Sequence, residues 1–182
     1  MNDPDATGGA PSVVVTVGTD HHRFDRLVGW VDQWAVDHPD VAVLIQHGTA
    51  AAPVHARGVV MLGYDDLVAA MAGAAVVVAQ GGPATIMDAR SVGHRPIVVP
   101  RRAHLDEVVD DHQVTFVTWM AERELVWHAD DEGTLGRLLD DALANPKLVR
   151  IAPDTTASAA TLDRFREVVD PLLALGSRRR RG

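Results

Sequence analysis

The chain of 182 residues contains no cysteine. This absence excludes disulfide bonds, thiol nucleophiles and the cysteine-based zinc and iron–sulfur sites. No stretch approaches the roughly 18 uninterrupted apolar residues of a membrane-spanning helix. The first residues, MNDPDATGGAPS, have neither a basic leader nor an apolar signal core. We therefore expect a cytoplasmic protein.

Basic residues are also fewer than acidic ones, which gives the chain a formal net charge of -8. Nucleic-acid binding normally requires a basic face that neutralises phosphates, so we expect no nucleic-acid partner. The densest basic run is Arg178–Arg181. It lies in a predicted basic tail, residues 176–182, which either attracts anionic lipid weakly or keeps the chain in solution.

Three common ligand-binding motifs are absent as well. The first strand-to-helix loop, VTVGTDHHRFD, contains a single glycine, Gly18, where the dinucleotide fingerprint needs three at fixed spacing. The chain has no G-x-x-x-x-G-K-[ST] sequence and no G-x-S-x-G nucleophile elbow. These absences argue against a dinucleotide site, a P-loop and a serine hydrolase.

Short apolar runs alternate with segments of helical period along the chain, and this alternation is typical of βαβ units. Such runs predict strands buried on both faces; they are residues 12–17, 41–46, 58–62, 74–79 and 96–100, with a weaker one near ELVWHA. With 47% hydrophobic residues, the chain can form one core. We predict an α/β fold: one Rossmann-like three-layer domain with a mostly parallel sheet, residues 12–175, after a flexible tail, residues 1–11.

Helices are predicted between these strands and after the last one. The first follows apolar positions from Phe24 to Ala35, and the others fit residues 65–73, 84–93, 110–123, 130–146 and 160–176. Ligands of parallel α/β sheets bind outside the carboxyl ends of the strands. The strand-to-helix loops are therefore the places to look for a site.

The loop AQGGPAT follows the fourth predicted strand and has two glycines, Gly81 and Gly82. Pro83 suits a first helical turn and leaves the helix N-terminus open to an anion such as phosphate. Thr85 lies in that turn, and Asp88 lies one turn later, where a carboxylate can accept hydrogen bonds from a vicinal diol. An ordinary tight turn with Thr85 as a cap explains the same residues equally well.

The next loop, PRRAHLDEVVDDHQ, is dense in polar residues directly after a strand, which favours a site. Together, the elbow from Gly81 to Asp88, GHRPIVVPR from Gly93 to Arg101 and DDHQ from Asp110 to Gln113 resemble the C-terminal, donor-binding domain of glycosyltransferase family 28. The likeness is strongest from Gly63 to Gln113. It is close to the small stand-alone catalytic subunits of two-component UDP-sugar transferases, of the dolichol-linked chitobiose or bacterial exopolysaccharide type.

The resemblance implies the C-terminal half of a GT-B glycosyltransferase, which binds a UDP-sugar as donor substrate and needs no other cofactor. Gly18, Thr19, Gly81, Gly82 and Thr85 would face the diphosphate. Tyr64 would receive the uracil and Asp88 the ribose hydroxyls. His112 and Gln113, next to Asp111 in the same motif, would contact the donor sugar. Helix N-termini, together with Arg101 or Arg102, would stabilise the leaving group.

The resemblance also implies an inverting, metal-independent transfer of a hexosyl group. The catalytic base would belong to a separate, membrane-anchored, acceptor-binding subunit, which would hold a lipid-linked acceptor for polysaccharide or glycolipid synthesis. That partner would recruit this chain to the inner face of the cell membrane. The chain alone would bind the donor and turn over poorly.

Several residues depart from the family pattern. Asp88 stands where Glu is usual, Gln80 where His or Ser is common, and Pro83 removes one amide from the phosphate cradle. The DHH run from Asp20 to His22 lacks a counterpart, and its two imidazoles either face phosphate or solvate the helix start. Two other functions stay open: a non-catalytic nucleotide-sugar-binding or regulatory module, and an enzyme similar to UDP-sugar 2-epimerases.

Overall fold

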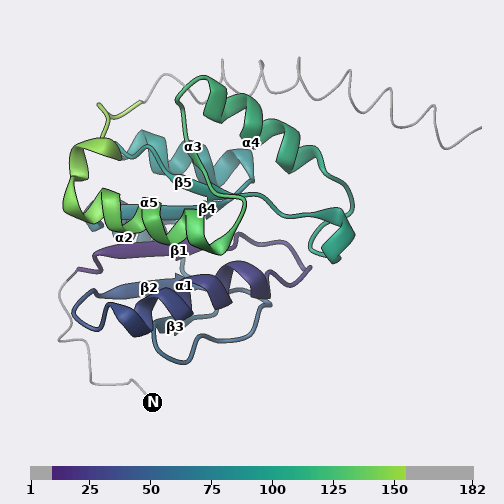
Figure 1. Cartoon of the computed structure of the whole chain (residues 1–182), viewed down its shortest axis with the longest axis horizontal. Helices are drawn as coiled ribbons and strands as arrows, with labels where there is room; N and C mark the ends of the chain where they lie inside the picture. The colour runs from purple at the N-terminus through teal and green to yellow at the C-terminus, as the bar shows by residue number, and fades with distance from the viewer. Residues whose placement is uncertain (1–9, 155–182) are drawn as a thin grey trace, which may run out of the picture.

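A six-stranded sheet with all strands parallel forms the centre of the molecule, and the computed structural model describes residues 10–154 (Figure 1). The spatial order is β3-β2-β1-β4-β5-β6. The strands are β1 (Val13–Thr16), β2 (Val43–Gln46), β3 (Arg57–Val59), β4 (Val76–Gln80), β5 (Ile97–Val99) and β6 (Trp127–His128). The chain order reverses between β1 and β4, which makes this the topological switch point of the sheet.

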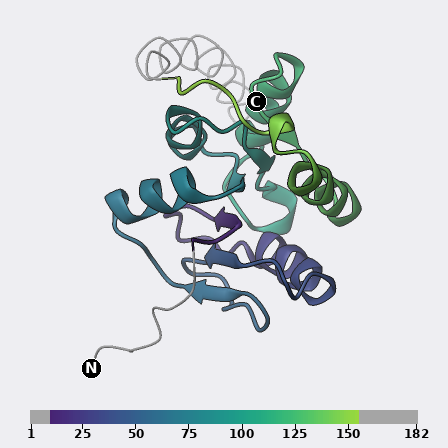
Figure 2. The same cartoon turned by 90° about the vertical axis from the view of Figure 1, so that its left-hand side faces the viewer.

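Helices cover both faces of the sheet, so that it is the middle one of three layers (Figure 2). They are α1 (Asp25–Asp37), α2 (Tyr64–Gly73), α3 (Pro83–Ser91), α4 (His112–Glu122) and α5 (Glu132–Ala144), with short 3₁₀ turns η1 (Ala103–Leu105) and η2 (Pro146–Leu148). Helices α1 and α5 pack on one face, and α2, α3 and α4 pack on the other.

The alternating direction of side chains along each strand explains these layers. Val13 and Val15 of β1 belong to the cluster under α1 and α5, whereas Val14 belongs to the cluster under α2. Successive strand residues point to opposite faces, so a strand between two helical layers must be apolar at every position. Each fully buried valine or leucine side chain contributes about 1.5–3 kcal/mol.

The structure confirms the predicted α/β fold with its parallel sheet, including the weak strand, which is β6. The third strand ends earlier than predicted, at Val59. After it, the N–H of Leu62 donates a hydrogen bond to the side chain of Gln46, the last residue of β2. The last predicted helix, residues 160–176, lies outside the described residues. None of the helices within residues 10–154 is long and apolar enough to cross a membrane.

Candidate functional site

A cavity of about 560 Å³ lies at the carboxyl ends of β1, β2 and β4, on the side of α2 and α3. We name it the β1–β4 cavity. Its volume is within the range of roughly 300–1,000 Å³ that is typical of small-molecule sites. It is lined by Thr16, Gly18, Thr19, Gln46, Met61, Leu62, Tyr64, Leu67, Gln80, Gly82, Pro83, Ala84, Thr85 and Asp88.

Two buried polar side chains at strand ends tie the walls of this cavity together. Oγ1 of Thr16 accepts hydrogen bonds from the N–H of Gly18 (3.2 Å) and from Nε2 of Gln46 (3.1 Å). Oε1 of Gln46 accepts one from the N–H of Leu62 (2.9 Å). Thr16 and Gln46 are also direct neighbours in the β1–β2 register. The loops after β1 and β3 are thereby fixed to the same pair of side chains.

The Gln80 side chain fills the space that two glycines leave free. A Cβ on Gly82 would lie 2.1 Å from Nε2 of Gln80, and a Cβ on Gly18 would lie 2.7 Å from it. Gly18 also has a φ of 76°, which favours glycine. Gln80 is 9% exposed, and its Oε1 has no hydrogen-bond partner among the described residues. Because buried polar atoms are rarely left unpaired, this amide is suited to meet a ligand.

Two helix N-termini border the cavity without a side-chain cap. Helix α3 starts at Pro83 after Gly82, and α2 starts at Tyr64 after Gly63. The first N–H groups of a helix have no partner within it and carry a partial positive charge. The described residues that line the cavity include no lysine or arginine. Attraction for an anion therefore comes from the backbone and from the Thr85 hydroxyl, not from cationic side chains.

Tyr64 and Asp88 connect α2 to α3 at the edge of the cavity. The Tyr64 hydroxyl donates a hydrogen bond of 3.1 Å to Oδ1 of Asp88, and Tyr64 is 66% exposed. This hydrogen bond, together with the negative charge of Asp88, raises the pKa of Tyr64. The carboxylate therefore has a hydroxyl partner already, and a ligand diol would replace it.

Arg101 lies outside the cavity and is completely buried. Its Nη1 donates to the carbonyl oxygens of His22 (2.8 Å), Glu107 (2.9 Å) and Arg23 (3.4 Å), and its Nη2 donates to that of Val17 (2.9 Å). Burial lowers the pKa of Arg101, while the charges of Asp20 and Glu107 oppose that shift. The guanidinium thus joins the β1–α1 loop to the loop after β5.

A bidentate ion pair strengthens the same junction. Nε and Nη2 of Arg26 donate to Oε1 (2.8 Å) and Oε2 (2.7 Å) of Glu107, which is 5% exposed. Oε2 of Glu107 also accepts the N–H of Arg102 (2.9 Å). Such paired, hydrogen-bonded charges fix geometry well. The junction holds the loop that begins with Gly18 and Thr19.

The DDHQ residues form a neighbouring group at the start of α4. Oε1 of Gln113 accepts the N–H of Arg101 (3.2 Å), and it would lie 2.9 Å from a Cβ on Gly81. Oδ1 of Asp111 accepts the N–H of Ala103 (2.9 Å). The His112 ring lies 2.7 Å from the Asp110 carboxylate. Gln113 therefore packs directly behind the glycine elbow.

Comparison with known proteins identifies the domain. Residues 12–170 match the glycosyltransferase family 28 C-terminal domain. The chain belongs to this family. No curated protein sequence matches it.

Two solved structures share the fold of this family 28 domain. MurG of Acinetobacter baumannii is 19% identical with a TM-score of 0.53, and the match covers 79% of this chain and 44% of MurG. The glycotransferase of kitacinnamycin is 14% identical with a TM-score of 0.56, and the match covers 81% of this chain and 40% of that protein. The family 28 chain thus spans less than half the length of either structure, and its fold is that of the C-terminal half of GT-B glycosyltransferases.

The structure gathers six of the predicted site residues of this family 28 domain around one cavity. They are Gly18, Thr19, Tyr64, Gly82, Thr85 and Asp88. Gly81, against which Gln113 packs, adjoins Gly82 in the chain, but Gly81, Gln113, Arg101, Asp111 and His112 are not among the residues that line it. Sequence reasoning did not select Thr16, Gln46 and Gln80 as site residues. The sequence does contain a signal for them, because each is a polar residue that ends an otherwise apolar strand.

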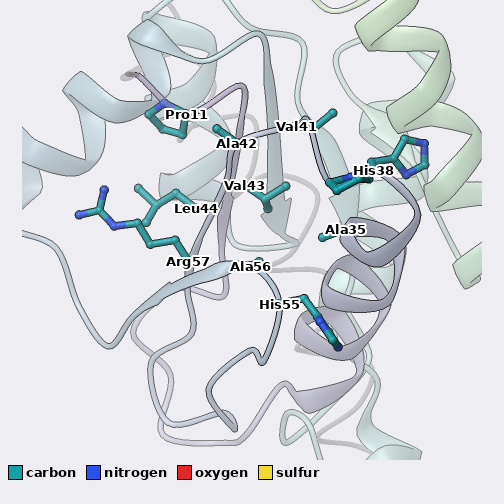
Figure 3. Close-up of a pocket in the computed structure, with 11 residues that line it drawn as sticks. Pro11, Ala35, His38, Val41, Ala42, Val43, Leu44, His55, Ala56 and Arg57 are labelled. Carbon is teal, nitrogen blue, oxygen red and sulfur yellow. The ribbon is translucent and has the colours of Figure 1, made fainter. Parts of the chain in front are cut away.

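A smaller cavity of about 270 Å³ lies at the opposite edge of the sheet, near the first residues of β2 and β3. Figure 3 shows it beside the C-terminal part of α1, with the Arg57 side chain extending away from that helix. Nonpolar residues such as Val43, Leu44 and Ala56 form much of its wall. Since ligands of parallel sheets bind at the carboxyl ends of the strands, we do not assign the donor site here.

Proposed function

We propose that the β1–β4 cavity binds the UDP moiety of a UDP-sugar, and that the chain is the donor-binding catalytic subunit of an inverting hexosyltransferase. The observation that carries the proposal is the pairing of two chemistries in one cavity of a family 28 domain. One end has the uncapped N-terminus of α3 for an anion, and the other has the Asp88 carboxylate for a diol.

The proposed orientation of the nucleotide follows from these two ends. The diphosphate lies against Gly18, Gly82 and Thr85, where backbone N–H groups and a hydroxyl supply donors. The ribose hydroxyls bond to Asp88, and the uracil lies against Tyr64 and the apolar Leu67. The donor sugar then extends toward Gln113, behind the glycine elbow.

A thermal-shift and calorimetry panel tests donor binding with UDP, UDP-sugars, GDP-sugars and NAD. We expect UDP and one or more UDP-sugars to stabilise the chain and GDP-sugars and NAD to have little effect. Asp88→Ala should weaken UDP binding by roughly 10- to 100-fold, since hydrogen bonds to a charged group contribute about 1.5–3 kcal/mol. Asp65→Ala is a matched control, because Asp65 is an exposed acid of α2 that does not line the cavity.

The results distinguish a failure of donor binding from a failure of the proposed ribose role of Asp88. If UDP does not stabilise the chain, donor binding itself is refuted. If UDP binds and Asp88→Ala behaves like the Asp65 control, only the ribose role of Asp88 is refuted.

We further propose that acceptor binding and the catalytic base come from a separate membrane-anchored subunit, which holds a lipid-linked acceptor. The resemblance of the chain to the donor-binding domain of family 28 supports this division. We expect transfer of labelled sugar only when this chain is mixed with that subunit. Robust transfer by the purified chain alone would contradict the division, and binding of UDP without transfer with any partner would favour a non-catalytic module.

A further inference from the structure

Asp20, His21 and His22 follow Thr19 directly in the loop between β1 and α1, and none of the three lines the β1–β4 cavity. One potential ligand atom from each of the three lies within 4.8 Å of the others. Nδ1 of His22 is 2.7 Å and Nδ1 of His21 is 3.5 Å from the same atom, Oδ1 of Asp20. The two imidazole rings are 4.0 Å apart between centroids.

These distances are close to those within a metal coordination shell. Nitrogen and oxygen ligands lie about 2.0–2.2 Å from a zinc ion, so they stand roughly 3 Å from each other. Two ring nitrogens converge on one carboxylate oxygen, and a metal ion can take the place of the ring N–H protons that face this oxygen. Two imidazoles and one carboxylate form a donor set that binds first-row transition metals in preference to Mg²⁺ or Ca²⁺.

Two acids near the cluster, Asp25 and Glu107, are already paired with arginines, whereas the Asp20 carboxylate contacts the two histidines. Arg23 is paired with Asp25 at 3.0 Å, and Arg26 is paired with Glu107 at 2.7 Å. Burial raises the pKa of Asp20, but hydrogen bonds from His22 and the charge of Arg101 outweigh it and lower the pKa overall.

The cluster is also accessible to an ion. The side chains of His21 and His22 are 85% and 24% exposed. Both face an open hollow of about 620 Å³ that extends to Leu105, Asp106 and Glu107. Waters or a ligand oxygen have room there to complete the coordination sphere, while the Arg101 junction holds the His22 carbonyl beneath it.

We propose that Asp20, His21 and His22 bind one divalent transition-metal ion such as Zn²⁺, with the remaining coordination positions open to this hollow. The ion would replace the hydrogen bond between His22 and Asp20 and fix the loop that follows Thr19. The site is separate from the nucleotide, and it departs from the expectation that the chain holds no metal.

The test uses the full chain without a histidine tag, stripped of metal with a chelator. Calorimetry with Zn²⁺ and the visible absorption of Co²⁺ report the number of ions and their affinity. We expect one ion per chain, and at least tenfold weaker binding in His21→Ala and in His22→Ala. His104→Ala is the control, because His104 is exposed on η1 and not part of the cluster.

Circular dichroism of each variant shows that it folds, and UDP binding is measured on the same samples. Absence of a Co²⁺ spectrum and of Zn²⁺ heat overturns the inference, as does equal binding by the double variant His21→Ala/His22→Ala. A chain that binds UDP but no metal refutes only this inference. A chain that binds metal but no UDP refutes only the proposed function.

Discussion

The Tyr64 hydroxyl and the Asp88 carboxylate are joined by a hydrogen bond of 3.1 Å that links the first turn of α2 to α3. Both residues line the cavity in which we place the nucleotide. In the proposed complex the ribose hydroxyls take the place of the Tyr64 hydroxyl on Asp88. Binding therefore exchanges one hydrogen bond for others instead of adding new ones to a free carboxylate.

This exchange predicts the effect of Tyr64→Phe. The variant keeps the aromatic ring and removes the competing hydroxyl, so we expect UDP to bind roughly threefold more tightly, a change typical of one modest hydrogen bond. Calorimetric titration of both proteins with UDP measures it. Weaker binding by the variant would show that the hydroxyl contacts the nucleotide itself.

The contact between Gly82 and Gln80 predicts a non-additive pair of substitutions. In Gly82→Ala the new Cβ would meet Nε2 of Gln80 at 2.1 Å, at the far end of a flexible side chain, so we expect a loss of about 1 kcal/mol in the free energy of unfolding. Gln80→Ala removes that side chain, and the double variant should recover most of the loss. Urea denaturation of the two single variants and the double variant measures the coupling. Additive losses would exclude this contact as the cause.

Substitutions of Arg101 distinguish a structural role of its side chain from a role in stabilising the leaving group. Its side chain is fully buried on four backbone carbonyls, so Arg101→Met should lower the free energy of unfolding by about 3 kcal/mol or more. Arg101→Lys keeps the charge but not the fork of donors, and should also be less stable. At temperatures where it is folded, we expect its affinity for UDP to change little. A stable Arg101→Lys protein that no longer binds UDP would instead support the leaving-group role that the family resemblance implies.

His94 predicts how stability depends on pH. Burial, and then the charge of Arg150, lower the pKa of this fully buried histidine to about 4, and its Nε2 lies 2.8 Å from the carbonyl oxygen of Met71. The unfolded chain takes up a proton near pH 6.5, whereas the folded chain does so only near pH 4. The contribution of neutral His94 to the free energy of unfolding is therefore complete above pH 6.5. It decreases by roughly 3 kcal/mol as the pH falls to 4.

His94→Gln should remove this part of the pH dependence. Urea denaturation of the wild-type and variant proteins between pH 4 and 7.5 measures it. Parallel stability curves for the two proteins over that range would contradict the prediction.

The amino-acid sequence alone determined the layers and their order. Continuous apolar strands such as Val13–Thr16 can only lie between two helical layers, and their alternation with helical segments requires a parallel sheet. The glycine elbow was also visible in the sequence, since glycine permits backbone conformations that other residues avoid and proline fixes φ. Gly82, Thr85 and Asp88 could be selected as candidates from this segment alone, but only the motifs around it favoured a ligand site over an ordinary turn.

Only the tertiary structure decided which distant residues meet at the site. It placed Gln80 between Gly18 and Gly82, joined Tyr64 to Asp88, and directed the Arg101 guanidinium into the protein instead of toward the cavity. Local sequence shows where a polar residue follows a strand, but not in which direction its side chain points. That direction depends on which carbonyls, glycines and charges the other strands bring beside it, and these contacts span up to 84 positions in the chain.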